Sequence, residues 1–289
     1  MKPKIIKIIA LIAALIMTAG LFTACNNNQD FYSNASFFKV NTKEETCLSF
    51  HLTMFSKKKI KVVEFLGAEG TGFEQGELTV NIIDSTIDEI SNKKFKGFYA
   101  KTLLIEIMPN AELETITISA MLFNVDNENR KVSFSNNIKH EFSKGINFSE
   151  ILEIRFIPVE FSSAAIGNGS SFGYDFVAME NITLQDIYCL DFVNVRIVEI
   201  RIDDIAVENA ALPFDVQEEQ KVSIILIYET ESLTEFDYAM TNLYFSFNTE
   251  QDSELRNNAF IIIFDPIYPI MNNDTSHIRN FIEKLIAEK

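Results

Sequence analysis

The sequence predicts an all-β protein made of one or two antiparallel β-sandwich domains, followed by a short C-terminal amphipathic helix. Runs of alternating apolar and polar residues recur along the chain at intervals of roughly 15 to 20 residues, as expected for short sandwich strands. Residues that favour turns separate these runs. No helical period occurs between them, which excludes a fold of alternating strands and helices.

The first half of the chain holds the clearest strand patterns. Leu48, Phe50, Leu52 and Met54 fall on one face of the run at 46–55. Apolar residues likewise alternate with threonine and serine in the run at 113–125, which predicts another half-buried strand. Further strands are predicted at residues 60–66, 78–84, 98–108, 132–134 and 152–156, with turns at 67–72, 109–110 and 126–129.

A segment rich in small residues, 162–173, divides the predicted strands into two groups and suggests a domain boundary or a long loop. After it, strands are predicted at residues 188–202, 221–229, 238–248 and 259–264. We therefore expect a first immunoglobulin-like sandwich over residues 46–161 and a second over residues 174–289. One large sandwich is the alternative.

The last segment of the chain has a different period. Apolar residues recur there at helical spacing, at Ile278, Phe281, Ile282, Leu285 and Ile286. The sequence Asp-Thr-Ser at 274–276 offers side chains that cap helix N-termini. This pattern predicts an amphipathic helix whose apolar side packs against the sandwich.

The first 25 residues resemble a lipoprotein export signal. Three lysines precede an almost uninterrupted apolar run, residues 8–21, which is too short to span a membrane comfortably. The sequence Phe-Thr-Ala-Cys at 22–25 resembles the lipobox of bacterial lipoproteins. The resemblance implies that residues 1–24 are a signal peptide and that Cys25 carries a diacylglyceryl group and further fatty acids such as palmitate.

This resemblance also implies a location. The mature protein would be anchored by lipid at the cell surface, on the extracytoplasmic face of the cell membrane, because two or three acyl chains give stable attachment. Residues 25–45 would then form the lipidated cysteine and a flexible tether, since most of them are polar and show no period.

The charge of the chain limits its partners. The net charge is −16, and removal of residues 1–24, which contain three lysines and no acidic residue, changes it to −19. Such a chain is repelled by nucleic acid and by an anionic membrane surface. The sequence therefore predicts no nucleic-acid partner and attachment to the membrane through lipid alone.

No metal or cofactor site is predicted. The three histidines, His51, His140 and His277, are distant in sequence from one another and from the cysteines. The acidic groups at 126–129 and 272–274 do not match a calcium-binding loop and are more typical of a turn and a helix cap. Cys47 and Cys189 could form a disulfide outside the cytoplasm, although two cysteines alone do not define one.

One motif leaves an enzymatic alternative open. The sequence Gly-Ser-Ser-Phe-Gly at 169–173 matches the Gly-x-Ser-x-Gly elbow of serine hydrolases, with Ser171 as nucleophile and His277 as base. However, no helical period follows the motif, and no oxyanion-hole motif is present. The preferred hypothesis is a non-catalytic module that binds a protein or glycan ligand. The alternative is a surface hydrolase that uses Ser171.

Overall fold

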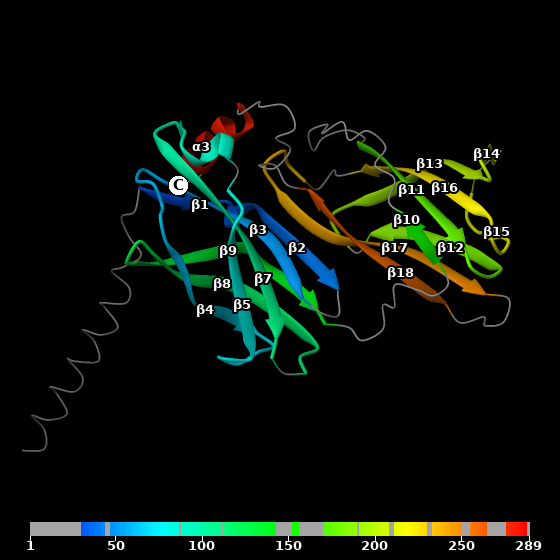
Figure 1. The fold of residues 1–289 in the computed structure, drawn as a ribbon, viewed down its shortest axis with the longest axis horizontal. Helices are drawn as coiled ribbons and strands as arrows, with labels where there is room; N and C mark the ends of the chain where they lie inside the picture. Colours follow the sequence, from blue (N-terminus) through cyan, green and yellow to red (C-terminus); the bar gives the residue numbers. More distant parts are fainter. Residues whose placement is uncertain are drawn as a thin grey trace, which may run out of the picture.

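A computed structural model describes most of the chain (Figure 1). The described residues are 30–43, 47–86, 88–110, 112–142, 152–155, 170–189, 191–207, 211–229, 233–249, 255–264 and 276–287. They form three β-sheets, two short helical turns and one longer helix near the C-terminus. The predicted all-β sandwich class with a short C-terminal helix is confirmed.

The central sheet has eight strands in the order β15-β12-β17-β2-β9-β8-β4, and β18 pairs with β17 beside this path. Its strands are β2 (Phe38–Lys43), β4 (Val63–Thr71), β8 (Thr115–Val125), β9 (Glu128–Glu141), β12 (Ile182–Cys189), β15 (Phe214–Val216), β17 (Tyr238–Thr249) and β18 (Arg256–Phe264). All its pairs are antiparallel except those of β2, which runs parallel to both β17 and β9.

Two smaller sheets pack against the central sheet. The first outer sheet has the order β1-β3-β7-β5, with β6 on β7, and the second has the order β10-β11-β16-β13-β14. The first contains β1 (Phe31–Ser33), β3 (Leu48–Ser56), β5 (Leu78–Asp84), β6 (Lys94–Phe95) and β7 (Phe98–Pro109). The second contains β10 (Leu152–Arg155), β11 (Ser170–Ala178), β13 (Asn194–Ile202), β14 (Ile205–Ala206) and β16 (Lys221–Glu229).

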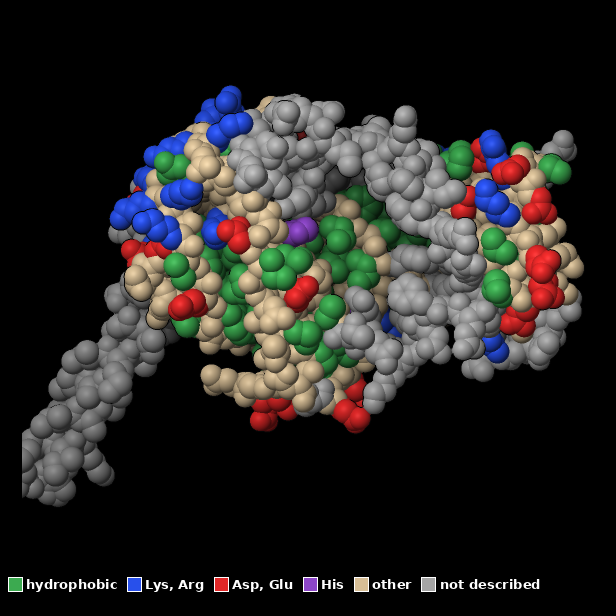
Figure 2. All heavy atoms as spheres, in the orientation of Figure 1, with side chains coloured by type: hydrophobic (Ala, Val, Ile, Leu, Met, Phe, Trp, Pro, Cys, Tyr) green, Lys and Arg blue, Asp and Glu red, His purple; other side chains and the backbone are tan. Residues whose placement is uncertain are grey.

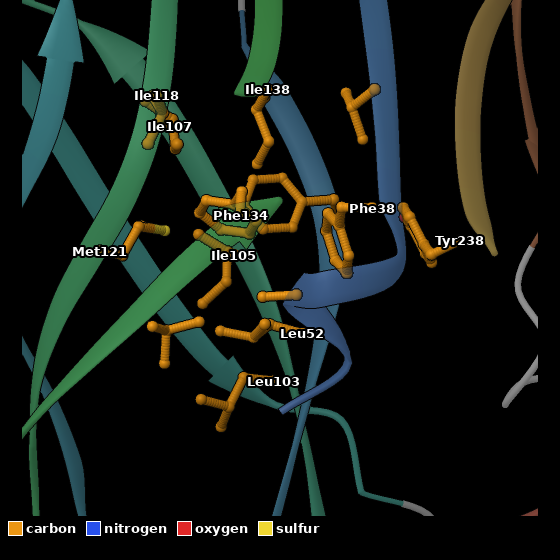
Figure 3. Packing of buried hydrophobic residues seen from close by; sticks show 14 of the residues in the cluster. Phe38, Leu52, Leu103, Ile105, Ile107, Ile118, Met121, Phe134, Ile138 and Tyr238 are labelled. Carbon is orange, nitrogen blue, oxygen red and sulfur yellow. The ribbon is translucent and has the colours of Figure 1, made fainter. Parts of the chain in front are cut away.

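Each outer sheet encloses a hydrophobic core with the central sheet. The first core includes Phe38, Phe50 and Phe134, whose rings pack edge-on or tilted at centroid distances of 5.3 to 6.3 Å (Figure 3). The second includes Phe176 and Phe245, with ring centroids 6.3 Å apart. Burial of such aromatic side chains supplies much of the driving force for folding.

Strand β17 belongs to both cores. Tyr238 and Met240 lie in the first core, whereas Ala239, Leu243 and Phe245 lie in the second. Because successive side chains of a strand point to opposite faces, the two cores lie on opposite faces of β17. The molecule is therefore two sandwiches that share one sheet.

The sheet branches along one edge of β17. Its first residues pair with β2 as far as Thr241, and β12 pairs with the same strand from Leu243 onward. Between them, the buried side chain of Asn242 accepts a hydrogen bond from the Lys43 amide (2.6 Å) and donates one to the Lys43 carbonyl (2.9 Å). The Asn242 side chain therefore provides hydrogen-bond partners for the backbone N–H and C=O of Lys43, at the point where β2 leaves β17.

The predicted tether over residues 25–45 differs from the structure. Residues 31–43 form β1, the 3-10 helix η1 (Asn34–Phe37) and β2, and Phe38 and Val40 are fully buried. The polar residues Lys39, Asn41 and Lys43 alternate with these buried positions, so the strand resembles a polar segment in sequence. Residues 25–29 and 44–45 lie outside the described part of the chain.

The division at 162–173 also differs in part. The structure has two cores, but β2 and β17, from opposite halves of the chain, are paired within one sheet. Residues 170–173, placed in a boundary or loop, begin strand β11. Alternation identifies a strand without identifying its neighbours, and here the neighbours are about 200 residues apart.

The C-terminal helix packs on the first sandwich, not on the second as its place in the sequence suggests. Helix α3 (Ser276–Ala287) buries Ile278, Phe281, Ile282 and Leu285 in a third cluster. Its other members come from residues 32–100, including the hairpin of β6 and β7, and the short helix α2 (Asp88–Ser91) contributes Ile90. The predicted amphipathic face is the buried face.

Strand β4 continues through the predicted turn at 67–72. Two register shifts, after Phe65 and after Glu69, let the glycines fit beside β8. A Cβ atom on Gly70 would lie 1.8 Å from the Thr117 carbonyl oxygen, so any side chain there would clash with backbone. The predicted turn at 126–129 is present, and Asp126 and Asn127 have positive φ there.

Candidate functional site

A pocket lies where the first sandwich meets the turn that follows β12. Its cavity volume is about 530 Å³, and its lining includes Asn41 of β2, Asn136 and Lys139 of β9, and the turn residues Asp191 and Phe192. Ligand sites commonly occur at such junctions between structural units. This pocket is our candidate site.

A large irregularity in β9 builds one wall of the pocket. Ser133 pairs with Ala120 and Ile138 pairs with Ile118, so four residues of β9 stand opposite Ser119 alone. Phe134 fills the first core, and the exposed Ser135, Asn136 and Asn137 line the pocket instead. Bulges of this kind often redirect side chains next to binding sites.

Asn136 also replaces a missing backbone hydrogen bond. Its side-chain amide donates to the Phe38 carbonyl at 3.1 Å, beside the irregularity. The parallel ladder between β2 and β9 begins only at Asn41 and Lys139. The wall is therefore held in a defined position, although it is not a regular strand.

The opposite wall comes from the turn that joins β12 to β13. The Asn41 side-chain amide donates a hydrogen bond to the Asp191 carboxylate, which ties this turn to β2. Phe192 has φ = 64°, a conformation that is unfavourable for a bulky residue and that clusters at functional sites. The turn is thus fixed against the pocket despite its backbone strain.

Two lysines line the pocket, and one of them is paired with a carboxylate. Lys39 forms an ion pair with the nearly buried Asp237 (3.1 Å). Lys139 is exposed at the pocket and has no carboxylate within ion-pair distance among the described residues. Amide donors and an ammonium group suit a ligand with hydroxyl and carboxylate oxygen atoms.

The structure also contains a buried pair of phenols far from this pocket in sequence. Tyr174 and Tyr228 share a hydrogen bond inside the second core. Burial raises the pKa of both phenols, that of Tyr174 to about 12, so both stay protonated at neutral pH. This pair is a structural feature of the core.

Cys47 and Cys189 do not form a disulfide in the structure. Burial raises the pKa of the Cys189 thiol to about 12, so it carries almost no thiolate at neutral pH.

Within the described ranges no three metal-ligating side chains form a group. His140 is buried and shares a hydrogen bond with Thr42 (2.9 Å), and burial lowers the pKa of His51.

The structure does not support a nucleophile elbow at Ser171. Ser171 pairs with Ile227 inside β11, a strand that continues to Ala178, whereas an elbow lies between a strand and a helix. His277 belongs to α3, which packs on the first sandwich, while β11 belongs to the second outer sheet. The two elements therefore pack on different cores.

Sequence reasoning did not identify the pocket residues. The break in alternation after Phe134 was a weak signal for the irregular wall, because the predicted strand stopped there. Nothing in the sequence indicates the positive φ of Phe192 or the hydrogen bond from Asn41 to Asp191.

The predicted lipidation site Cys25 and the calcium candidate at 272–274 lie outside the described residues. Among the described helices, none is long and apolar enough to cross a membrane.

Comparisons with known proteins assign no family. No family model and no curated protein matches the chain. A solved protein of unknown function from Porphyromonas gingivalis W83 aligns with 6% identity and a TM-score of 0.23, over 80% of this chain and 98% of that chain. The CupB6 tip adhesin from Pseudomonas aeruginosa aligns with 9% identity and a TM-score of 0.18, over 75% and 91% of the two chains. Similarity at this level defines neither a family nor a function for this chain.

Proposed function

We propose that this protein is a non-catalytic binding module, attached by lipid to the extracytoplasmic face of the cell membrane. The observation that carries the binding role is the pocket beside β2, with its volume of about 530 Å³ and its wall of amide side chains. The hydrolase alternative has no comparable support, since Ser171 lies within a strand.

The ligand class follows from the polar groups of the pocket. Asn137 and Ser135 offer hydrogen-bond donors and acceptors, which match the hydroxyl groups of a sugar. Lys139 adds a positive charge that favours a carboxylate, and Phe192 adds an apolar surface. An acidic glycan combines these features, so we propose it as the ligand.

This proposal predicts a preference for an acidic sugar over its neutral counterpart. Glucuronate should shift the backbone amide resonances of Asn136, Asn137 and Lys139 in two-dimensional NMR spectra, and glucose should do so more weakly. Lys139→Ala should weaken glucuronate binding about tenfold, because a hydrogen bond to a charged group contributes about 1.5 kcal/mol or more.

Lys131→Ala is the matched control. Lys131 lies on the same strand but pairs with Glu69 at 2.5 Å, outside the pocket, so this variant should bind glucuronate like the parent protein. The ligand proposal fails if glucuronate shifts no pocket resonance. It also fails if the two lysine variants lose affinity equally.

The lipid anchor makes a separate prediction. Cys25→Ser should abolish incorporation of a radioactive fatty acid and leave an uncut, slower-migrating precursor, because the cysteine sulfur is the acceptor of the lipid. Cys47→Ser, which removes a cysteine of the folded domain, should incorporate label normally. Label that persists in Cys25→Ser protein would contradict the anchor.

A further inference from the structure

The positive charges of this acidic protein are not evenly distributed. Lys and Arg side chains gather at one end of the molecule, whereas Asp and Glu predominate at the other end in the same view (Figure 2). We define the lysine face as a group of exposed residues from two neighbouring connections: Lys57, Lys58, Lys59, Lys61, Lys93, Lys94 and Lys96.

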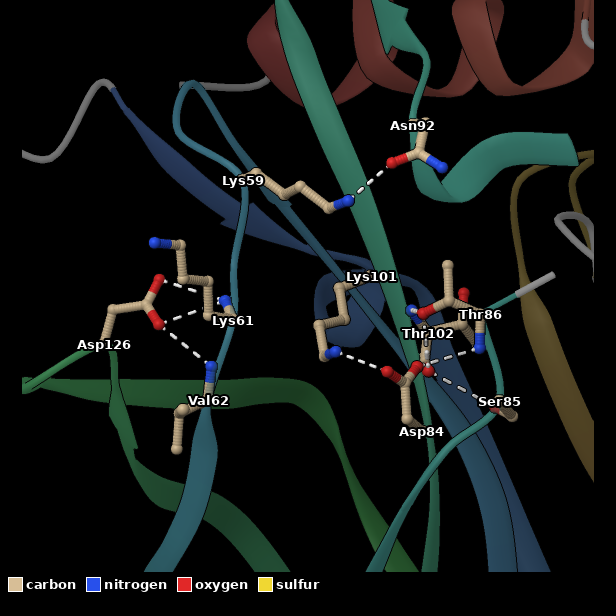
Figure 4. A network of polar contacts seen from close by, with 10 residues as sticks. All are labelled: Lys59, Lys61, Val62, Asp84, Ser85, Thr86, Asn92, Lys101, Thr102 and Asp126. Carbon is tan, nitrogen blue, oxygen red and sulfur yellow. Dashed lines mark hydrogen bonds and ion pairs between the residues drawn. The ribbon is translucent and has the colours of Figure 1, made fainter. Parts of the chain in front are cut away.

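A side-chain hydrogen bond joins these connections, and burial of Ile60 fixes the first of them. Residues 57–61 join β3 to β4, and residues 93–96 lie around β6. The Lys59 ammonium donates to the Asn92 side-chain oxygen at 2.5 Å (Figure 4), and Ile60 between the lysines is buried in the first core. The lysines are therefore presented on a fixed backbone.

Most of the lysine face is not neutralised by carboxylates. Lys57 pairs with Asp30 and Lys96 pairs with Glu283. Lys58, Lys93 and Lys94 have no carboxylate partner within ion-pair distance among the described residues, although Lys94 lies over the ring of Tyr99 at 4.9 Å.

Asp126, an acidic residue beside the lysine face, forms hydrogen bonds with backbone amides. The Asp126 carboxylate accepts hydrogen bonds from the amides of Lys61 and Val62, at 2.9 to 3.2 Å (Figure 4). The lysines therefore outnumber the acidic side chains described beside them, so the face carries net positive charge.

The lysine face adjoins the first described residue of the chain. Asp30 is the first described residue, and its backbone oxygen accepts a hydrogen bond from the Lys57 amide at 3.1 Å. Cys25 precedes Asp30 by five residues, which span at most about 18 Å when fully extended. A lipid on Cys25 would hold the lysine face close to the lipid headgroups.

We propose that the lysine face docks on the anionic surface of the membrane that holds the lipid anchor. Several lysines near an anionic leaflet attract it, and this attraction falls off within about 10 Å at moderate salt. The acidic second sandwich lies at the opposite end of the molecule from the lysine face (Figure 1), so salt screens much of the repulsion between its carboxylates and the membrane surface. The docked orientation rests on the proposed anchor, but affinity of the face for anionic lipid does not.

Binding to vesicles tests the face without the anchor. Every described strand and helix begins after residue 30, so a chain that starts at residue 26 keeps all of these elements. At low salt it should sediment with vesicles that contain phosphatidylglycerol, and not with vesicles of phosphatidylcholine alone. Lys58→Gln, Lys93→Gln and Lys94→Gln together should reduce binding about 100-fold, at about fivefold per lysine.

A variant with the same change in net charge provides the control. Arg196→Gln, Arg201→Gln and Arg256→Gln together remove three exposed charges from the acidic half and should leave vesicle binding nearly unchanged. Equal losses in the two triple variants, or no binding to anionic vesicles, would overturn the proposal. Binding of soluble polyphosphate without binding of vesicles would also overturn it. If the parent protein did not incorporate fatty acid at Cys25, the anchor proposal would fail, but the affinity of the lysine face for anionic lipid would stand.

Discussion

Replacing Phe281 by alanine should lower the free energy of unfolding by about 3 to 5 kcal/mol, the usual cost of truncating a fully buried aromatic side chain. Phe281 is 1% exposed, and its ring centroid lies 5.3 Å from that of Phe37 and 5.9 Å from that of Phe55. The cavity would open between the helix and the first sandwich, because these partners belong to η1 and β3. Urea unfolding followed by circular dichroism measures the change.

Ile286→Ala is the matched control in the same helix. Ile286 is 43% exposed, so its truncation should change stability by no more than about 0.5 kcal/mol. If Phe281→Ala were as mild as Ile286→Ala, the helix would not be packed on the sandwich as described. The helical period in the sequence predicts both residues on one side, and only the structure separates them.

Alternation predicted strands well where one face is buried and the other is exposed. The predicted strand at 113–125 corresponds closely to β8 (Thr115–Val125), and the predicted strand at 221–229 matches β16 (Lys221–Glu229). The predicted strand at 188–202 was wrong near its start, because a turn at Asp191 and Phe192 separates β12, which ends at Cys189, from β13, which begins at Asn194. Asp191 is the one turn-favouring residue there, a weaker signal than the cluster of such residues at 126–129.

Pairing between distant strands was beyond prediction from one sequence. Alternation predicted a strand at Tyr238, but Phe38 fell in the predicted tether, so their pairing in parallel strands could not be foreseen. The candidate pocket depends on this pairing, since β2 supplies Asn41 and the nearby β9 supplies Asn136. Without the pairing, these residues are ordinary polar positions on separate strands.

Strand β17 explains how one sheet can belong to both sandwiches. Residues 238–247 of β17 are all buried, as expected for a strand covered on both faces. Thr241, Asn242 and Ser246 are polar members of this buried run, and the contacts of Asn242 with Lys43 show how one of them is satisfied. Strand β17 therefore couples the stability of the two cores.

Tyr238→Ala tests the packing of β17 on the first sandwich and should cost about 3 to 5 kcal/mol of unfolding free energy. Tyr238 is fully buried and stacks on Phe38, with ring centroids 4.4 Å apart and an interplanar angle of 15°. Its hydroxyl oxygen accepts a hydrogen bond from the His51 amide of the first outer sheet at 3.3 Å. One side chain of β17 thus contacts β2 beside it and β3 across the core.

Tyr238→Phe separates the ring from the hydroxyl group. It keeps the stacking and removes one long hydrogen bond, so we expect a loss of about 1 kcal/mol. In Tyr238→Ala protein, amide hydrogen exchange should speed up more at Val40 and Phe50, which share the first core with Tyr238, than at Leu226 of the second core. If Tyr238→Ala lost no more stability than Tyr238→Phe, the aromatic stack would not join β17 to the first sandwich.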